Sequence, residues 1–187
     1  MTNLGDREIR SSLIRKLKQQ VAKPKAIIEE LRVHNGNAIA DVVALYTEAH
    51  CFEIKGDGDK VERITEQGQY YNSSFRKITL VTTRRHVSKA LSIAPNYWGI
   101  MVAEEINDQV TLRYVRRAKN NANFDKGLAL MTLWKSEMLS LTYGHNKTDK
   151  KKSREILAEL ISASRKKAEL SKEISELLFT RHLQAKA

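Results

Sequence analysis

The sequence predicts a mixed α/β fold, with one sheet flanked by helices and a small all-helical segment at the end. Three observations lead to this prediction. Strand-like and helix-like patterns alternate up to about residue 118. Beyond that point only helical patterns remain, after the polar, turn-rich stretch 120–123. The 187 residues can bury one sizeable core, or one core and a small second module.

The first 118 residues contain the expected sheet. Their patterns predict, in chain order, a helix over 7–20, strands over 38–45 and 51–55, a helix over 60–75, a strand over 77–83, a helix over 84–94, and strands over 98–103 and 110–115. The segment 26–33 suits either a helical turn or a strand. Asp59 is expected to be the N-cap of the helix that begins at residue 60.

The remaining residues predict a helical segment. Helical spacing covers residues 128–142, 153–164 and 168–183, and the basic connector 147–152 lies between the first two. We therefore expect one domain over residues 1–118 and a basic helical module over residues 119–187.

The net charge of +11 is unevenly distributed along the chain. Residues 1–110 contain 16 Lys and Arg against 14 Asp and Glu, whereas residues 111–187 contain 17 against 8. Such a basic surplus favours binding to a phosphate backbone, although a solvated basic surface is the simpler alternative. The absence of a long apolar run argues against a membrane protein, and the single cysteine, Cys51, fits a reducing cytoplasm.

Asp41, Glu53 and Lys55 form the combination of residues that points most directly to chemistry. Two carboxylates suit Mg²⁺, and a neighbouring lysine suits a reaction in which negative charge develops on a phosphodiester. Side chains alternate faces along a strand, so a hairpin turn of odd length is required to place the three on one face. If Tyr46 pairs with His50, Asp41 lies opposite Lys55. The alternative is that Asp41 caps its strand or only pairs with Lys55.

These residues resemble the signature of the PD-(D/E)XK nuclease superfamily. The resemblance covers roughly residues 7–118 and rests on Asp41, on Glu53-Ile54-Lys55, and on Gln67 and Tyr71, which are similar to the additional motif of the RecB-like branch. Together with Glu30-Leu31 and Trp98-Gly99-Ile100, they look like a small bacterial and phage branch of that superfamily. The resemblance implies a restriction-endonuclease-like sheet. Ala40 precedes Asp41 where the superfamily name has proline.

The resemblance also implies a role for each residue. Asp41, Glu53, the carbonyl of Ile54 and Glu30 would hold Mg²⁺ or Mn²⁺, and Lys55 would orient the attacking water or stabilise the developing charge. Gln67 and Tyr71 would position the substrate strand or a water molecule. Alternatively, Glu29 and Glu30 are solvated carboxylates, and Gln67 and Tyr71 are ordinary helix residues.

The C-terminal segment resembles a SAP-like helix-extended-helix module. This resemblance implies that basic residues near a helix N-terminus contact DNA phosphate, namely Lys150, Lys151, Lys152 and Arg154. The connector lacks the expected glycine. A plain helical bundle, or an element that docks a protein partner, is the alternative.

The sequence as a whole predicts a cytoplasmic, Mg²⁺-dependent DNA endonuclease or exonuclease of phage or bacterial origin, with a basic helical tail that holds the duplex. Cutting both strands would favour a homodimer. The main alternative is a degenerate nuclease fold that binds nucleic acid, or inhibits a partner, without turnover. A structural interaction protein is a third interpretation.

Overall fold

One six-stranded mixed sheet organises the protein, and its strands lie in the order β1-β2-β3-β4-β5-β6. The computed structural model describes residues 3–142 and 149–186. Its helices and strands are α1 (Asp6–Gln19), β1 (Ala26–Val33), β2 (Ala38–Leu45), β3 (Ala49–Lys55), α2 (Ile64–Ser74), β4 (Lys77–Thr83), α3 (Arg84–Ile93), β5 (Gly99–Ile106), β6 (Gln109–Arg116), α4 (Lys126–Leu130), α5 (Lys135–Ser140), α6 (Arg154–Ser164) and α7 (Lys167–Gln184).

The sheet combines antiparallel and parallel pairs. Strands β1, β2 and β3 form an antiparallel meander, and β5 pairs with β6 in the same way. The β3–β4 and β4–β5 pairs are parallel. Parallel neighbours need a crossover connection, which α2 and α3 provide. The predicted mixed α/β class is therefore confirmed, and the ambiguous segment 26–33 is a strand.

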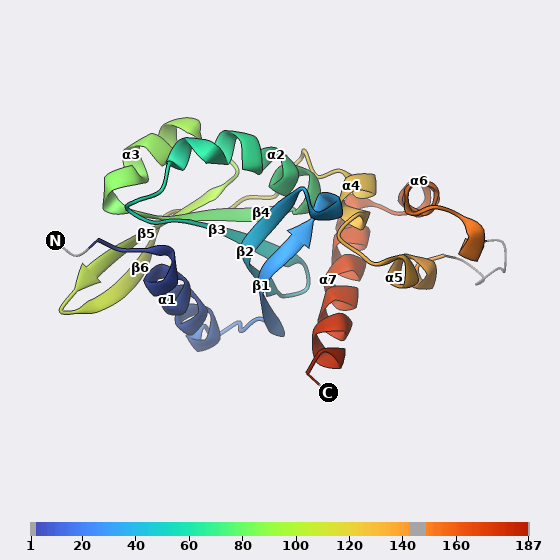
Figure 1. Ribbon diagram of the computed structural model, residues 1–187, viewed down its shortest axis with the longest axis horizontal. Coiled ribbons are helices and arrows are strands. Elements are labelled where there is room, and N and C mark those ends of the chain that lie inside the picture. The colour runs from blue at the N-terminus through green and yellow to red at the C-terminus, as the bar shows by residue number, and fades with distance from the viewer. Residues whose placement is uncertain (1–2, 143–148, 187) are drawn as a thin grey trace.

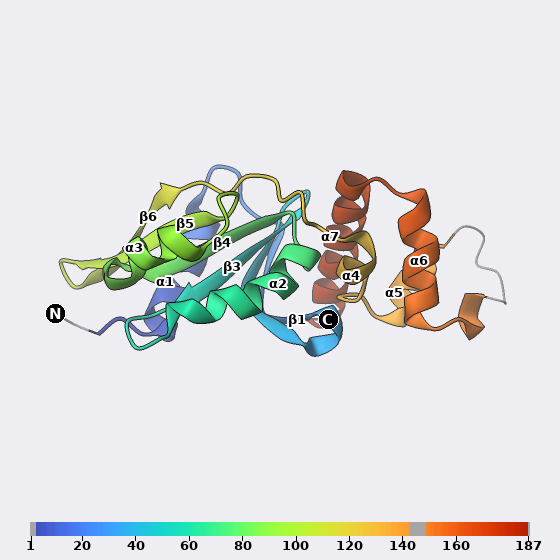
Figure 2. The ribbon, with the colours of Figure 1, turned by 90° about the horizontal axis from the view of Figure 1, so that it is seen from above.

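Helices cover both faces of the sheet (Figures 1 and 2). Helix α1 packs on one face through Ile9, Leu13 and Leu17, which share a buried cluster with Phe52 of β3. Helix α2 packs on the other face, and its Tyr71 is fully buried there. Because each face carries its own apolar cluster, the central strands are buried on both sides.

The core on the α2 face continues into the C-terminal helices. The same cluster includes Leu130 of α4, Ile161 of α6 and Leu178 of α7. The hydroxyl of Ser175 in α7 also donates to the carbonyl of Tyr46, the first residue of the β2–β3 turn. The sheet and the C-terminal helices, which the sequence predicts to separate near residue 118, therefore share one continuous hydrophobic core. None of the described helices is both long and apolar enough to span a membrane.

The prediction of one continuous helix over residues 128–142 is wrong. It is interrupted between α4 and α5, and α5 begins where the backbone N–H of Trp134 donates to the Glu137 side chain at 2.6 Å. Distant arginines bind the carbonyls that the interruption frees. Arg154 donates to the carbonyls of Met131 and Leu133 at 2.8 and 2.7 Å.

Asp59 does not cap helix α2. The helix begins at Ile64, after a short 3-10 segment. Instead, Asp59 accepts a hydrogen bond from the backbone N–H of Gly56 at 2.7 Å. Its carboxylate thus closes the turn that follows β3, because that nearer donor is available to it.

Candidate functional site

The hairpin of β2 and β3 brings Asp41 and Glu53 together. Leu45 pairs with Ala49 across the three residues 46–48, so the turn has the odd length that the site requires. The turn lies one residue earlier than it would if Tyr46 paired with His50, which would make residues 47–49 the turn. The register of Val42 with Phe52 continues to place Asp41 opposite Glu53, not opposite Lys55.

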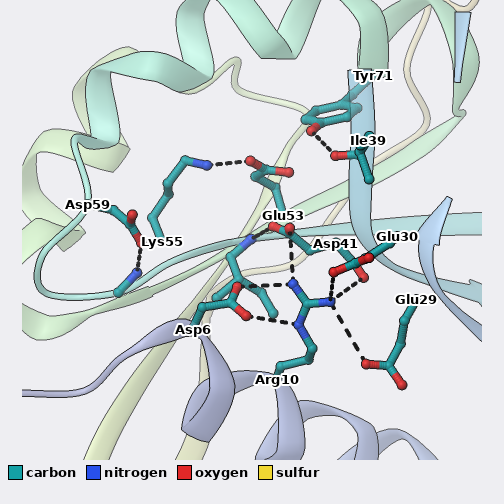
Figure 3. Close-up of polar contacts among 12 residues, drawn as sticks. Asp6, Arg10, Glu29, Glu30, Ile39, Asp41, Glu53, Lys55, Asp59 and Tyr71 are labelled. Carbon is teal, nitrogen blue, oxygen red and sulfur yellow. Dashed lines mark hydrogen bonds and ion pairs between the residues drawn. The ribbon is translucent and has the colours of Figure 1, made fainter. Parts of the chain in front are cut away.

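Asp41 is fixed where the recorded pairing of β2 with β3 ends (Figure 3). One carboxylate oxygen, Oδ2, accepts a hydrogen bond from the backbone N–H of Ile54 at 2.7 Å. The Asp41 side chain retains 21% exposure. Ile54 therefore holds the orientation of Asp41 through its N–H, whereas the sequence resemblance assigned a role to its carbonyl.

Glu53 and Lys55 form a buried ion pair on the α2 side of β3. Their side chains are only 2% and 9% exposed. Lys55 contacts Oε1 of Glu53, and the other oxygen, Oε2, is buried without a hydrogen-bond partner in the described structure. A buried acceptor without a partner is costly, so this oxygen is available to a ligand.

Helix α2 brings Gln67 and Tyr71 to the same side. The two are one helical turn apart, and Gly68 between them allows the helix to approach the sheet: a Cβ at Gly68 would lie 3.1 Å from the Trp98 ring. The Tyr71 hydroxyl donates to the carbonyl of Ile39 at 2.8 Å. Burial and the charge of Glu53 raise the pKa of Tyr71 far above its usual value, so it stays protonated.

Gln67 presents a second buried oxygen without a partner. Its side-chain Oε1 has no hydrogen bond in the described structure. Both orphaned atoms, on Gln67 and Glu53, are oxygen acceptors, and a cation or an oriented water molecule satisfies acceptors of this kind.

Burial and the charge of Glu53 disfavour the ionised form of Asp41. Burial first, and then the nearby Glu53, raise the pKa of Asp41 to about 7. The Ile54 N–H and the Lys55 charge act in the opposite direction but do not cancel this effect. A bound cation would favour the ionised form of both carboxylates.

The donor set fits a hard divalent cation. Asp41 and Glu53 supply two carboxylates that act on each other electrostatically, and Mg²⁺ commonly uses one or two protein carboxylates and retains several waters. Within residues 3–142 and 149–186, no group of three or more His, Cys, Asp or Glu side chains is arranged to hold a metal. Asp41 and Glu53 are thus the residues that could hold Mg²⁺ or Mn²⁺, with water and substrate oxygens as further ligands.

Sequence reasoning missed Arg10, which reaches the site from α1. Its guanidinium lies 3.4 Å from Oδ1 of Asp41 and 3.6 Å from a carboxylate oxygen of Glu30, as Figure 3 shows. A shorter 2.9 Å contact to Asp6 tethers it within its own helix. The only local signal is that Asp6 and Arg10 are four residues apart.

Glu30 and Glu29 lie on the exposed side of this cluster. Glu29 is 3.9 Å from Arg10. Glu30 has a positive φ of 54°, an unusual backbone conformation for a residue other than glycine. Such conformations concentrate at functional sites, where the surrounding structure holds them in place. The ion pair that Glu30 forms is with Arg10, which also contacts Asp41, and the metal-binding role expected for Glu30 stays a prediction.

The basic residues predicted for DNA contact divide into two groups. Lys150 and Lys151 are exposed, whereas Lys152 pairs with Asp149 at 2.5 Å. The guanidinium of Arg154 is used within the fold. It donates to the carbonyls of Met131 and Leu133 and to the side-chain oxygen of Asn35. Lys147 of the basic connector lies outside the described residues.

Comparisons with known proteins point to phage proteins. A family model described as Bacteriophage P4 protein cII matches residues 1–184. Protein cII of Enterobacteria phage P4 is 27% identical over 139 residues, which cover 74% of this chain and 53% of the relative. The chain thus spans about half the length of the curated relative that it matches.

One solved structure was also found. The SPO1766 protein of unknown function from Silicibacter pomeroyi matches with a TM-score of 0.38 and 19% identity, over 51% of this chain and 60% of that chain.

Proposed function

We propose that this protein, which belongs to the Bacteriophage P4 protein cII family, is a divalent-metal-dependent endonuclease that hydrolyses phosphodiester bonds in DNA. The observation that carries the proposal is the meeting of Asp41, Glu53 and Lys55 at the open end of the β2–β3 hairpin. Two orphaned acceptor oxygens, on Glu53 and Gln67, support it.

Each side chain has a task in this proposal. Asp41 and Glu53 would hold Mg²⁺ or Mn²⁺, which when bound supplies Lewis acidity and lowers the pKa of water. Lys55, which is already beside Glu53, would place its positive charge near the scissile phosphate. Gln67 would orient the attacking water through its free Oε1. Tyr71 is a positioning residue, since its hydroxyl is used on the Ile39 carbonyl.

DNA is the proposed substrate because of the chain's charge. The net charge is +11, and Lys150 and Lys151 are exposed on the C-terminal segment. Cations on such a surface neutralise backbone phosphates and give binding that weakens with salt. We propose that these two lysines contact the duplex. Arg154 holds the fold in place, and the helices beyond α4 are also the surface on which a protein partner would dock.

A second function is favoured by Arg10. Arg10 lies 3.4 Å from Asp41 and places a positive charge beside that carboxylate without a metal, as would suit a nuclease fold without turnover. Such a protein would bind nucleic acid, or inhibit a partner, without cutting.

Cleavage of supercoiled plasmid separates the two functions. The protein, Asp41→Ala and Lys55→Ala are compared in Mg²⁺, Mn²⁺ and EDTA, with Glu66→Gln as a control on the exposed face of α2. The nuclease proposal predicts metal-dependent nicking that both site variants lose and the control retains. Retention of DNA on a gel without nicking would support the binding protein.

A further inference from the structure

A groove of about 870 Å³ lies at the end of the sheet opposite the Lys55 end of β3. Residues from the end of α1, the β2–β3 turn, the first residue of β4 and the end of β6 line it. Phe52 lines the groove from the α1 face of β3. The groove is thus separate from the carboxylates, because Glu53 directs its side chain to the other face.

The groove carries unneutralised positive charge. Lys16, Lys77 and Arg117 come from three different parts of the chain, and no carboxylate of the described residues lies within ion-pair distance of any of them. The groove's own acid, Glu48, is already paired with Arg76 through contacts of 3.0 and 2.8 Å. Three converging cations without a counter-ion favour an anionic ligand.

The groove also carries aromatic surface. Tyr46 and Tyr114 both line it and are partly exposed. The Arg117 guanidinium lies over the Tyr114 ring, 4.8 Å from its centre, so the cation and the aromatic ring form a cation–π pair within the groove. The Tyr46 hydroxyl donates to Gln20 at 3.0 Å, which fixes its ring.

We propose that this groove binds nucleotide units of a single-stranded nucleic acid, with phosphates on Lys16, Lys77 and Arg117 and a base against Tyr114. A cationic groove with aromatic side chains is the combination by which proteins bind single strands without reading sequence. Its volume also suits a ligand of nucleotide size. The inference extends the proposed nuclease function, but the groove can bind a strand whether or not the carboxylates cut one.

Fluorescence anisotropy of a labelled oligothymidylate in EDTA tests the groove without turnover. The double variant Lys77→Glu/Arg117→Glu is compared with Lys172→Glu/Lys186→Glu, which makes the same change in net charge on exposed residues of the C-terminal segment that have no proposed role in binding. We expect the groove variant to weaken binding at least about tenfold. Its slope of log affinity against log salt should fall by about 1.4, or 0.7 for each lost phosphate contact. The control should change affinity less than about twofold.

Two further arms test the base and the source of the ligand. Tyr114→Leu should weaken oligothymidylate binding about fivefold or more, because stacking on an aromatic ring contributes about 1–3 kcal/mol per base. Thymidine monophosphate at an equal nucleotide concentration should fail to displace the strand. Equal losses in the groove and control variants, unaltered binding by Tyr114→Leu, or displacement by the mononucleotide would overturn the proposal. If the protein fails to cut DNA in Mg²⁺ but gives the expected binding results, the nuclease proposal is refuted and the proposal that the groove binds single strands is supported.

Discussion

The guanidinium of Arg10 lies 3.4 Å from Oδ1 of Asp41, one of the two carboxylates that the proposed metal site requires. Asp41 does not depend on this contact for its orientation, because its other oxygen accepts the Ile54 N–H at 2.7 Å. Arg10 is itself tethered by Asp6. The arginine is therefore an internal counter-ion to the acidic cluster and would compete with a divalent cation bound there.

Removal of the Arg10 charge should tighten metal binding. Arg10→Gln leaves Asp41 oriented by Ile54 but removes a positive charge from the cluster, so its Kd for Mn²⁺ should fall about tenfold, or about 1.4 kcal/mol. Isothermal titration calorimetry of the metal-free protein measures this Kd, with Arg10→Lys as the control that retains the charge. Weaker binding by Arg10→Gln would show that Arg10 supports the site.

His50 should make folding sensitive to acid. Burial, and to a smaller extent the charge of Lys77, lower the pKa of His50 to about 3, against an ordinary value of 6.5. The unfolded chain therefore binds a proton that the folded chain does not, and stability is lost as pH falls below about 6.5. We expect the free energy of unfolding of the parent protein to fall more between pH 7 and pH 5 than that of His50→Asn. Urea denaturation at both values measures the difference, and parallel losses would contradict the account.

Gly68 should not tolerate a methyl group. A Cβ at this position lies 3.1 and 3.2 Å from two atoms of the buried Trp98 ring, so Gly68→Ala must displace α2 or the indole. Overpacking of this kind costs about 1–3 kcal/mol, which here should exceed the gain in helix propensity. Urea denaturation provides the measurement. Gly58→Ala is the control, since nothing lies within 4 Å of its Cβ; a Gly68→Ala variant as stable as this control would refute close packing.

Arg154 and Lys150 should separate stability from DNA binding. Arg154→Met leaves the carbonyls of Met131 and Leu133 without their donor, which should lower the free energy of unfolding by about 1.5–3 kcal/mol. Lys150→Ala, which is exposed, should leave stability unchanged and weaken duplex binding. Thermal unfolding and duplex anisotropy distinguish the two. A fully stable Arg154→Met protein with impaired DNA binding would show instead that Arg154 contacts DNA.

Local spacing predicted the carboxylate pair but not its surroundings. The alternation of side chains in a hairpin limits where Asp41, Glu53 and Lys55 can point, and helical spacing does the same for Gln67 and Tyr71. These relations span few residues. The exact register still depended on a turn that begins one residue earlier than expected.

Arg10 and the interrupted C-terminal helix could not be predicted in this way. Arg10 meets Asp41 across 31 residues, through the packing of α1 on the sheet. The interruption between α4 and α5 is stabilised by Arg154, 21 residues after Leu133. Contacts over such separations are set by tertiary packing, which the periodicity of a single segment does not encode.

The single-turnover rate of plasmid nicking in Mg²⁺ tests the central claim most directly. Glu53→Gln preserves the shape of the buried side chain but removes one ligand charge, and Glu66→Gln makes the same change on the exposed side of α2. The proposed nuclease predicts nicking by the parent protein, the same rate for Glu66→Gln within about twofold, and a loss of about a hundredfold or more for Glu53→Gln, since each tenfold in rate corresponds to about 1.4 kcal/mol of barrier. Equal nicking rates for Glu53→Gln and the parent, or no nicking by the parent in Mg²⁺ or Mn²⁺, would contradict it.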